Sequence, residues 1–393
     1  MKNSRTADAS ALTLPFPAKA AAVVALCFLL ASCAALVPAR ERIPTARAID
    51  DELRRLMAEE RIPGLAIAVI DGGAVMHVAA FGTRDLARNL PLDENTIMYA
   101  ASLNKPAFAY LVLQLAAEGR IDLDASIADY LARPLPEYSA YADLAGDDRW
   151  REITPRIILT HSTGFANFRR FESDGRLRIH WAPGKRYGYS GEGYRLLQFV
   201  LEEGLGVDVG AEMQERLFDR FGMSRTSMTW RDDFADNFAE TYDGDGALVP
   251  HDRRERADAA GSMDTTIADQ ALLWAAVMRG DGLARPFRSA FADGWLPIRS
   301  ARQFPSLGTA EDPRGPAIGL SAGLGVVAFR DKTGAMWFKG GHDDGTGNML
   351  VCHEIRRRCV VFLSNSVRAE KVYPELTRFI LGETATPWWW EYG

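Results

Sequence analysis

Strand-like sequences lie at the two ends of this chain, and this placement restricts the fold more than any other feature. Near the N-terminus, LAIAVIDGGAVMHVAAFG (65–82) holds two apolar, β-branched runs joined by a DGG turn, which predicts a hairpin. From Gly323 onward, GLGVVAFR, AMWFKG, GNMLVCHE and RCVVFLSN are typical of further strands. We therefore expect one sheet built from residues 64–83 and 323–365.

Helical patterns fill the rest of the chain. IDDELRRLMAEERIPG, from residue 49, has its apolar residues on one helical face and ends at Pro-Gly. Across residues 120–300, YRLLQFVLEEG and IADQALLWAAVMRG are the clearest helices, each closed by glycine. YPELTRFILG predicts a last helix on the sheet, and the apolar PWWWEYG is expected to pack on the body. The sequence thus predicts an α+β fold (mixed α/β) with a mainly helical lobe inserted between the sheet-forming ends.

The first residues have the character of an export signal. Basic residues precede the apolar run AAAVVALCFLLAS, which is shorter than the about 20 residues that a membrane-spanning helix needs. The run ends in LASC, so Cys33 resembles the lipidated cysteine of a bacterial lipobox. We expect a signal peptide over 1–33, a tether over 34–48, and a lipid anchor on the periplasmic side of a bacterial envelope. Ala34 favours the outer membrane; the alternative is plain cleavage to a soluble periplasmic protein.

The composition excludes some classes of protein. The formal net charge is −6 and no basic stripe is present, so nucleic acid is not an expected partner. The sequence has no internal repeat of solenoid or propeller length. Hydrophobic residues make up 47% of the chain, which is ample for a large core. The sequence leaves the oligomeric state open.

Two cysteines lie beyond the signal, Cys352 and Cys359, in MLVCHEIRRRCVVFLSN. Two β-rich runs flank a polar turn there, which predicts a hairpin. If Glu354 faces Arg357 across the turn, the two cysteines face each other. Cross-strand Cβ atoms can lie close enough for a disulfide, which the periplasm permits. The alternatives are this disulfide and two buried thiols.

A serine and a lysine stand three residues apart at the head of an apolar helix, in YAASLNKPAF (99–108). Residues at this spacing share a helical face, so Ser102 and Lys105 point the same way. Among Tyr, Ala, Leu and Phe, a lysine tends to lose its proton because burial disfavours the charged form. A neutral amine beside a serine hydroxyl is a general base beside a nucleophile. The alternative is a solvated serine and lysine in a first helical turn.

Further segments follow in order: ILTHSTGF (158–165), APGKRYGYSGEGYRLLQFVLE and AAGSMDTTIADQALLWAAVM. Together with ASLNKPAFAYLVLQLAAEG, they resemble the β-lactamase and penicillin-binding-protein superfamily, especially its branch of class C β-lactamases, D-alanyl-D-alanine carboxypeptidases and esterases. The resemblance runs from about residue 49 to 383. It implies a β-lactamase/transpeptidase-like fold, with an antiparallel sheet, helices on both faces and one serine hydrolase domain over 49–393.

The resemblance also implies roles for single residues. Ser102 would be the acylated nucleophile, Lys105 would receive or share its proton, and Tyr189 would be the proton-shuttling tyrosine of the second motif. The alternative for Tyr189 is a buried tyrosine with a hydrogen-bonded hydroxyl. Gly191 stands where the family usually has asparagine, so an amide that could bind the acyl side of a substrate is missing. No cofactor is implied.

The third motif of this family is Lys or His, then Thr, Ser or Gly, then Gly, on the strand that lines the site. Residues 332–334 spell Lys-Thr-Gly, but their position between two strand-like runs is typical of a hairpin turn. We therefore assign the motif to Lys339, Gly340 and Gly341. The alternative register starts at His342, where an aspartate replaces the glycine.

By analogy with the family, the backbone N–H groups of Ser102 and His342 would form the oxyanion hole. A charged Lys339 would lower the proton affinity of Lys105 and Tyr189 and would attract an anionic substrate.

Three other features have simpler explanations. Ser190 in GYSGE nearly matches G-x-S-x-G but fails at the last position. His161 starts a loop and is expected to brace the backbone. Asp343 and Asp344 beside His342 have no further ligand spacing around them, so no metal is expected.

We therefore expect an exported serine hydrolase that acts by acyl transfer on an ester, a D-amino-acid amide or a lactam, with a small-molecule or peptidoglycan-like substrate. Esterase or peptidase-like hydrolysis is favoured over efficient β-lactam hydrolysis because Gly191 removes the usual amide. The alternatives are a β-lactamase proper, a lipoprotein that binds penicillin or cell-wall fragments without turnover, and an envelope protein with a vestigial pocket.

Overall fold

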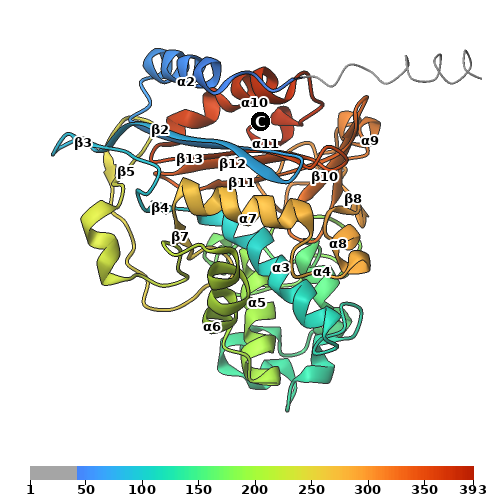
Figure 1. Cartoon of the computed structure of the whole chain (residues 1–393). Coiled ribbons are helices and arrows are strands. Elements are labelled where there is room, and N and C mark those ends of the chain that lie inside the picture. Colours follow the sequence, from blue (N-terminus) through green and yellow to red (C-terminus); the bar gives the residue numbers. More distant parts are fainter. Residues whose placement is uncertain (1–41) are drawn as a thin grey trace, which may run out of the picture. The chain divides into compact units, whose positions relative to one another are not determined.

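Both ends of the chain contribute strands to one antiparallel sheet, as the sequence predicts (Figure 1). The structure, a computed structural model, describes residues 42–393, of which Pro44–Gly393 form one unit. Within this part of the chain, nine strands lie in the order β3-β2-β1-β13-β12-β11-β10-β9-β8. Their bounds are β1 Gly64–Asp71, β2 Ala74–Asp85, β3 Leu90–Pro91, β8 Leu296–Pro297, β9 Ser321–Ala322, β10 Val327–Asp331, β11 Gly334–His342, β12 Gly347–His353 and β13 Arg358–Ser364.

Strand β1 joins the N-terminal and C-terminal parts of this sheet. It pairs with β2 on one side and with β13 on the other, where Leu65 lies opposite Ser364. Nearly all residues of β1 and β13 are buried, which explains their continuous apolar sequences. Gly72 and Gly73 form the β1–β2 turn with φ of 62° and 79°, and a two-residue hairpin turn of the primed type requires such positive values.

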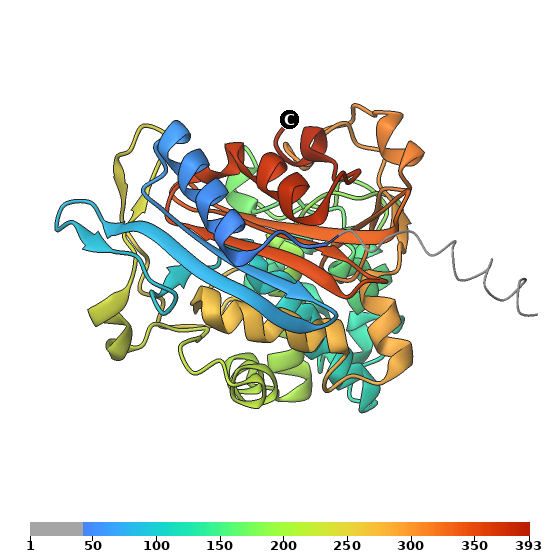
Figure 2. The same cartoon turned by 45° about the horizontal axis from the view of Figure 1, so that its top comes forward.

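Helices cover both faces of the sheet (Figures 1 and 2). One face carries α2 (Ala46–Glu60), α10 (Tyr373–Leu381) and α11 (Trp388–Glu391). On the other face, α7 (Ile267–Arg279) packs on β1, β2 and β13. Helix α2 buries the apolar face that its periodicity predicts, but it begins at Ala46, so residues 46–48 of the predicted tether are helical.

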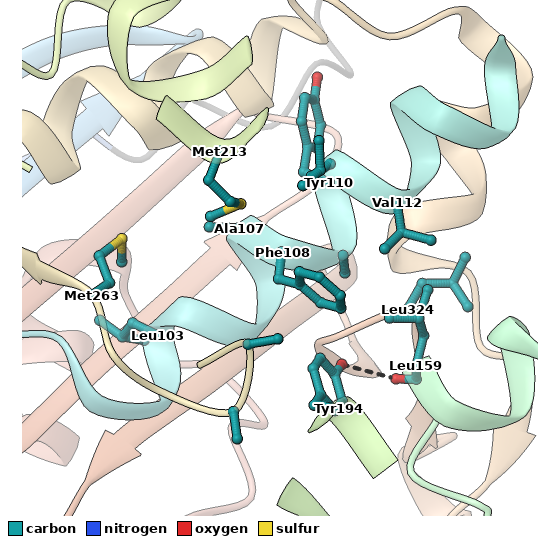
Figure 3. Close-up of a cluster of buried hydrophobic side chains, with 14 of the residues drawn as sticks. Leu103, Ala107, Phe108, Tyr110, Val112, Leu159, Tyr194, Met213, Met263 and Leu324 are labelled. Atoms are coloured by element: carbon teal, nitrogen blue, oxygen red, sulfur yellow. Dashed lines mark hydrogen bonds between the residues drawn. The ribbon is translucent and has the colours of Figure 1, made fainter. Parts of the chain in front are cut away.

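Helix α3 (Asn104–Ala117) is buried on all sides. The sequence predicts an apolar helix here, and every residue from Asn104 to Leu115 is buried. The reason is that the inserted lobe packs on the side that a surface helix would show to water. Figure 3 shows part of the cluster of buried hydrophobic side chains around α3, in which the ring centroids of Phe108 and Tyr194 lie 5.9 Å apart.

The segment between the sheet-forming ends is mainly helical, as predicted. Its other α-helices are α4 (Pro155–Leu159), α5 (Gly191–Phe199), α6 (Val209–Met213), α8 (Arg285–Ala292) and α9 (Arg314–Ala317). The 3-10 helices are η1 Ala101–Leu103, η2 Ile127–Tyr130, η3 Leu135–Glu137, η4 Ser139–Leu144, η5 Asp148–Glu152, η6 Arg169–Phe171, η9 Asp232–Asn237 and η10 Val367–Lys371. Two π-helical segments, η7 Val200–Gly204 and η8 Gln214–Asp219, extend α5 and α6. Small strand pairs join β4 (Met98–Tyr99) to β7 (Asp264–Thr265) and β5 (Thr241–Tyr242) to β6 (Leu248–Val249).

The hairpin of β12 and β13 contains a disulfide. Cys352 lies opposite Cys359, and their sulfur atoms are bonded. The Arg357 N–H donates to the Glu354 carbonyl at 3.1 Å across the turn. Of the two alternatives that the sequence leaves open, the structure therefore has the disulfide.

The export predictions fall mostly on residues 1–41. The signal peptide, the lipidation of Cys33 and most of the tether lie outside the described residues. Between residues 42 and 393, none of the helices combines the length and the apolar character that crossing a bilayer requires.

Candidate active site

Ser102 lies in a strained turn that leads into the central helix. The 3-10 turn η1 follows β4 and continues directly into α3. Ala101, the residue before the serine, has φ of 47°, a left-handed conformation that is costly for a residue with a Cβ. Surrounding contacts must hold such a conformation, and functional sites are where it occurs most often.

The amine of Lys105 contacts the hydroxyl of Ser102, as the helical spacing predicts. Its Nζ lies 3.0 Å from Ser102 Oγ and also donates to the carbonyl of Ala260. Lys105 is 0% exposed. Burial, with the nearby charge of Lys339, lowers the pKa of Lys105 well below the usual value for lysine. The amine is therefore suited to accept the serine proton.

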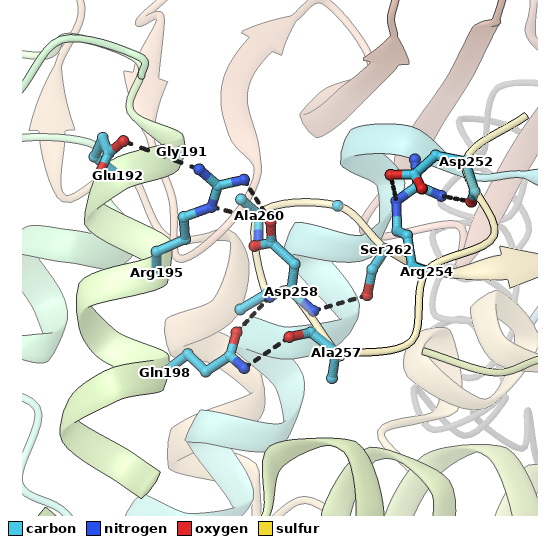
Figure 4. Close-up of polar contacts among 12 residues, drawn as sticks. Gly191, Glu192, Arg195, Gln198, Asp252, Arg254, Ala257, Asp258, Ala260 and Ser262 are labelled. Carbon is cyan, nitrogen blue, oxygen red and sulfur yellow. Dashed lines mark hydrogen bonds and ion pairs between the residues drawn. The ribbon is translucent and has the colours of Figure 1, made fainter. Parts of the chain in front are cut away.

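The loop over residues 257–262 contains Ala260, whose carbonyl accepts from Lys105. Figure 4 shows this loop with Arg195 and Asp258. Arg195 donates to Asp258 Oδ2 at 2.6 and 3.0 Å, and Asp258 Oδ1 accepts the Ala260 N–H at 2.9 Å. Asn104, beside the serine, donates from Nδ2 to two carbonyls of this loop at 3.1 and 2.8 Å. Hydrogen bonds from the Asn104 side chain to main-chain carbonyls therefore fix the loop against the start of α3.

Tyr189 completes the contacts of the serine. Its hydroxyl donates to Ser102 Oγ at 2.8 Å. Burial raises the pKa of Tyr189, and the hydrogen bond to Ser102 only opposes this shift. Lys339 Nζ lies 5.0 Å from the centroid of the Tyr189 ring. The lowering effect of Lys339 on the proton affinity of Tyr189 stays a prediction, and burial sets the net direction of the shift. The phenol stays protonated and acts as a donor.

His161 packs behind the tyrosine. The rings of His161 and Tyr189 are stacked, with centroids 4.3 Å apart and an interplanar angle of 29°. His161 Nδ1 accepts the Ser190 N–H at 3.1 Å, so the ring braces the backbone next to Tyr189. Burial, with the charges of Lys105 and Lys339, lowers the pKa of His161 well below its usual value. A neutral ring that fixes Tyr189 fits these contacts.

Ser190 caps a helix. Its Oγ accepts the Gly193 N–H at 3.1 Å at the start of α5 and donates to the Ala166 carbonyl at 2.9 Å. This is the role of an N-cap serine, which explains why a near match to G-x-S-x-G occurs here.

Phe168 fills the place of the missing asparagine side chain. A Cβ at Gly191 would lie 2.5 Å from Cε1 and 2.6 Å from Cζ of the Phe168 ring. The guanidinium carbons of Arg170 and Arg195 lie 4.2 and 4.8 Å from the centroid of this ring. The Gly191 N–H donates to Asn167 Oδ1 at 3.0 Å. The departure from the family pattern is therefore a packed arrangement, and a larger residue at position 191 would require the ring to move.

Strand β11 carries the predicted third motif past the serine turn. A Cβ at Gly341 would lie 2.7 Å from the Ala100 carbonyl oxygen and 2.9 Å from the Leu103 nitrogen, so only glycine allows this approach. Residues 332–334 instead lie at the β10–β11 turn, where Asp331 Oδ1 accepts the Thr333 N–H at 2.7 Å. The literal Lys-Thr-Gly therefore forms a hairpin turn, as the sequence predicts.

Lys339 is the second buried lysine of the site. It is 3% exposed, and its Nζ donates to the carbonyl of Gly340. Burial lowers the pKa of Lys339 to about 8, whereas the carboxylate of Glu391 acts in the opposite direction. Lys339 therefore carries a charge below about pH 8, while Lys105 loses its charge more readily.

A cleft of about 1170 Å³ opens beside the serine. Tyr99, Ser102, Phe168 and His342 are among its lining residues. Its charged lining residues are Arg170, Arg195, Glu202, Asp252, Arg253, Arg254, Glu255, Arg256, Asp258, Asp343 and Asp344. The cleft thus offers both signs of charge to a bound molecule. The oxyanion role of the Ser102 and His342 N–H groups stays a prediction.

Two contributors to this site were not anticipated from the sequence. The carbonyl of Ala260 leaves no sequence signal, because every residue has one. Glu391 approaches Gly340 from the C-terminal segment, and the signal for it was a lone acidic residue within PWWWEYG. The predicted Ser102, Lys105 and Tyr189 do lie together.

Comparisons with known proteins identify the family of this chain. The model of the β-lactamase family matches residues 49–384. The chain is 24% identical over 193 residues to a β-lactamase of Providencia stuartii (46% of this chain, 47% of the relative). It is 25% identical over 204 residues to esterase EstB of Burkholderia gladioli (45% and 50%) and 27% identical over 245 residues to a D-aminopeptidase of Brucella canis (59% and 47%). The matches thus span about half the length of these curated relatives.

Solved structures share the fold. A penicillin-binding protein homologue from Pyrococcus abyssi aligns with a TM-score of 0.69 at 20% identity, over 88% of this chain and 79% of that one. The D-alanine carboxypeptidase AmpC from Burkholderia cenocepacia aligns with a TM-score of 0.67 at 19% identity, over 86% and 99%. These alignments confirm the predicted β-lactamase/transpeptidase-like fold. The match of the family model over residues 49–384 establishes that this chain belongs to the β-lactamase family.

Proposed function

We propose that this protein is a serine hydrolase that forms an acyl-enzyme on Ser102. The observation that carries the proposal is the pair of contacts on Ser102 Oγ: a buried amine at 3.0 Å and a phenol at 2.8 Å. A free serine hydroxyl is a weak nucleophile, and an adjacent base activates it. The relatives named β-lactamase, esterase and D-aminopeptidase support the same class of reaction.

The contacts support a definite order of proton transfers. Ser102 Oγ bonds to the acyl carbon while its proton passes to the neutral Lys105 amine. The bond to the leaving oxygen or nitrogen then breaks, and that atom takes a proton relayed through Tyr189. Water attacks the resulting ester, its proton enters the same relay, and Ser102 leaves as a hydroxyl with release of the acid. Lys339 attracts an anionic substrate group.

Esters and D-amino-acid amides are the proposed substrates, in preference to lactams. The reason is the packing at position 191, where the ring of Phe168 occupies the volume that an asparagine amide would need. A hydrogen-bond donor to the acyl side of an N-acyl lactam is therefore missing from the start of α5. The cleft of about 1170 Å³ beside Ser102 supports a small molecule or a peptidoglycan-like fragment as the proposed substrate.

We also propose that the protein is exported and tethered by lipid at Cys33 to the periplasmic side of the outer membrane. The apolar run that ends in LASC supports this proposal. Expression of wild type and Cys33→Ala in cells given a labelled fatty acid tests it. Label in the wild-type outer-membrane fraction and none in the variant is the expected result; an unlabelled wild type contradicts it.

The test of the activity compares wild type, Ser102→Ala and Ser139→Ala. The last is the control, because Ser139 is an exposed serine in another segment of the chain. Each is incubated with a fluorophosphonate, p-nitrophenyl esters, a D-alanine p-nitroanilide and a chromogenic cephalosporin. Turnover and intact mass are followed. We expect adduct and turnover in wild type and Ser139→Ala only. An adduct without turnover would indicate a binding protein, and no adduct in wild type would indicate a vestigial pocket.

A further inference from the structure

The last residues of the chain place a carboxylate behind the third motif. Glu391 lies on the short helix α11, and its side chain is 0% exposed. An ideal Cβ at Gly340 would fall 1.9 Å from Glu391 Oε1. Gly340 has no positive φ, so the backbone conformation does not require glycine there. The carboxylate occupies the space that a side chain at position 340 would need.

Glu391 is held in this position by neighbouring polar groups. Gln303 donates from Nε2 to Glu391 Oε2 at 2.8 Å, and the Gln303 N–H donates to the Trp390 carbonyl at 2.9 Å. Trp390 also donates from Nε1 to Ser300 Oγ at 3.1 Å. A segment that is far in sequence from all three motifs is thus fixed against strand β11.

The other carboxylate oxygen has no hydrogen-bond partner among residues 42–393. A buried charge without a compensating group is costly, so its surroundings must supply one electrostatically. His342 Nε2 lies 4.0 Å away, and Lys339 is buried on the same strand. Interaction with His342 and with Lys339 lowers the pKa of Glu391, although burial raises it more. The charges on β11 and α11 therefore stabilise one another.

We propose that Glu391 is a positioning residue of the active site, whose carboxylate, fixed behind Gly340, favours the charged form of the neighbouring Lys339. The inference rests on the proposed function, since it concerns the same site. Lys339 Nζ lies 5.0 Å from the centroid of the Tyr189 ring, and the charge of Lys339 also acts on Lys105. His342 is on the same strand as Lys339. Behind His342, Glu370 Oε1 lies 3.3 Å from Nδ1, so this second carboxylate serves the histidine. Glu391 is the carboxylate that acts on Lys339.

The pH at which Lys339 loses its charge should depend on Glu391. With Glu391 in place, the pKa of Lys339 is about 8. Loss of a nearby negative charge disfavours the ammonium form, so the pKa of Lys339 falls when Glu391 becomes neutral. Activity that needs charged Lys339 is then lost at a lower pH.

The experiment measures kcat/KM of the full chain for an anionic p-nitrophenyl ester as a function of pH. In Glu391→Gln the alkaline limb should move down by about one pH unit. Glu391→Asp keeps the charge and should restore most of the wild-type profile. Glu383→Gln removes an exposed carboxylate of the same C-terminal region and should leave the profile unchanged. Lys339→Arg should lose the limb, because arginine does not titrate in this range.

The double variant Glu391→Gln/Lys339→Arg separates positioning from simple structure. If Glu391 acts through Lys339, adding Glu391→Gln to Lys339→Arg should not shift the pH dependence of kcat/KM. An equal loss of rate at every pH in both backgrounds would overturn the proposal, and so would an alkaline limb that persists in Lys339→Arg. Should Glu391→Gln fail to fold, Gln303→Ala releases the carboxylate and should move the limb in the same direction; an unmoved limb there also overturns it. Failure of the proposed function would give a different result: Ser102→Ala would then hydrolyse the ester as fast as wild type.

Discussion

Restoring the family asparagine at position 191 should destabilise this protein unless Phe168 is shortened at the same time. In Gly191→Asn the new Cβ would lie 2.5 Å from a carbon of the Phe168 ring, closer than packed carbon atoms approach. The backbone at Gly191 is helical with no positive φ, so the clash is with the ring and not with the conformation. The guanidinium carbons of Arg170 and Arg195 lie 4.2 and 4.8 Å from the centroid of this ring, so a movement of the ring disturbs both contacts.

The magnitudes follow from packing. Overpacking of this kind costs about 1–3 kcal/mol, which we expect as the loss of unfolding free energy in Gly191→Asn. Phe168 is only half-buried, so Phe168→Ala should cost less than the about 3–5 kcal/mol of a fully buried phenylalanine. In the double variant the clash is absent, and its stability should match that of Phe168→Ala. The coupling free energy between the two sites should therefore be about 1–3 kcal/mol.

Denaturant unfolding of the four proteins measures this cycle. Steady-state kinetics with a chromogenic cephalosporin and a p-nitrophenyl ester then measure the function of the new amide. One added hydrogen bond should raise the cephalosporin-to-ester ratio of kcat/KM in the double variant over Phe168→Ala by about 3-fold to 10-fold. If Gly191→Asn is as stable as wild type, or the coupling is zero, the packing argument is refuted. An unchanged ratio refutes the substrate argument alone.

Three further predictions concern the proton relay and the strand beside it. Tyr189→Phe keeps the ring that stacks on the histidine but removes the donor, so acylation by p-nitrophenyl acetate should slow by about 10²-fold to 10⁴-fold with little change in melting temperature; an unchanged rate would exclude the relay. Because burial lowers the pKa of Lys105, kcat/KM should fall as pH drops through that lowered value, and Lys105→Met should lack both the limb and the activity. The unfolded chain binds the Lys105 proton between that lowered value and about 10.4, so the contribution of Lys105 to unfolding free energy should rise with pH there, as calorimetry of wild type against Lys105→Met can measure. Gly341→Ala should push β11 from the serine turn, lower the free energy of unfolding by about 1–3 kcal/mol and reduce activity. The same change at exposed Gly175 should lower stability only by the strain of an alanine at positive φ and should leave activity unchanged.

Local patterns were sufficient for much of this protein. The DGG turn, the alternation of strands at both chain ends and the glycine-closed helices predicted the elements of the sheet and of the lobe. These features depend on residues close in sequence, whose backbone preferences and periodicity act within one element. The pairing of Ser102 with Lys105 is of the same kind, because both belong to one helical turn.

Long-range contacts were predictable only where a family pattern named the residue. Tyr189 was assigned by its motif, and the structure brings its hydroxyl to Ser102. Burial raises the pKa of Tyr189, and the motif does not give the extent of that burial, because it is a property of the packed site. The same holds for α3, whose apparent outer face is covered by the lobe.

The amino-acid order therefore specifies which secondary elements form and which side chains can carry the chemistry. Packing decides the surroundings of those side chains: the Ala260 carbonyl on Lys105, the Phe168 ring over Gly191, and the Glu391 carboxylate beside Gly340. Each of these comes from a segment distant in sequence, and no periodic pattern or turn signal relates it to its partner. Desolvation and close approach arise only when such segments are brought together, and they set the protonation and the selectivity of the site.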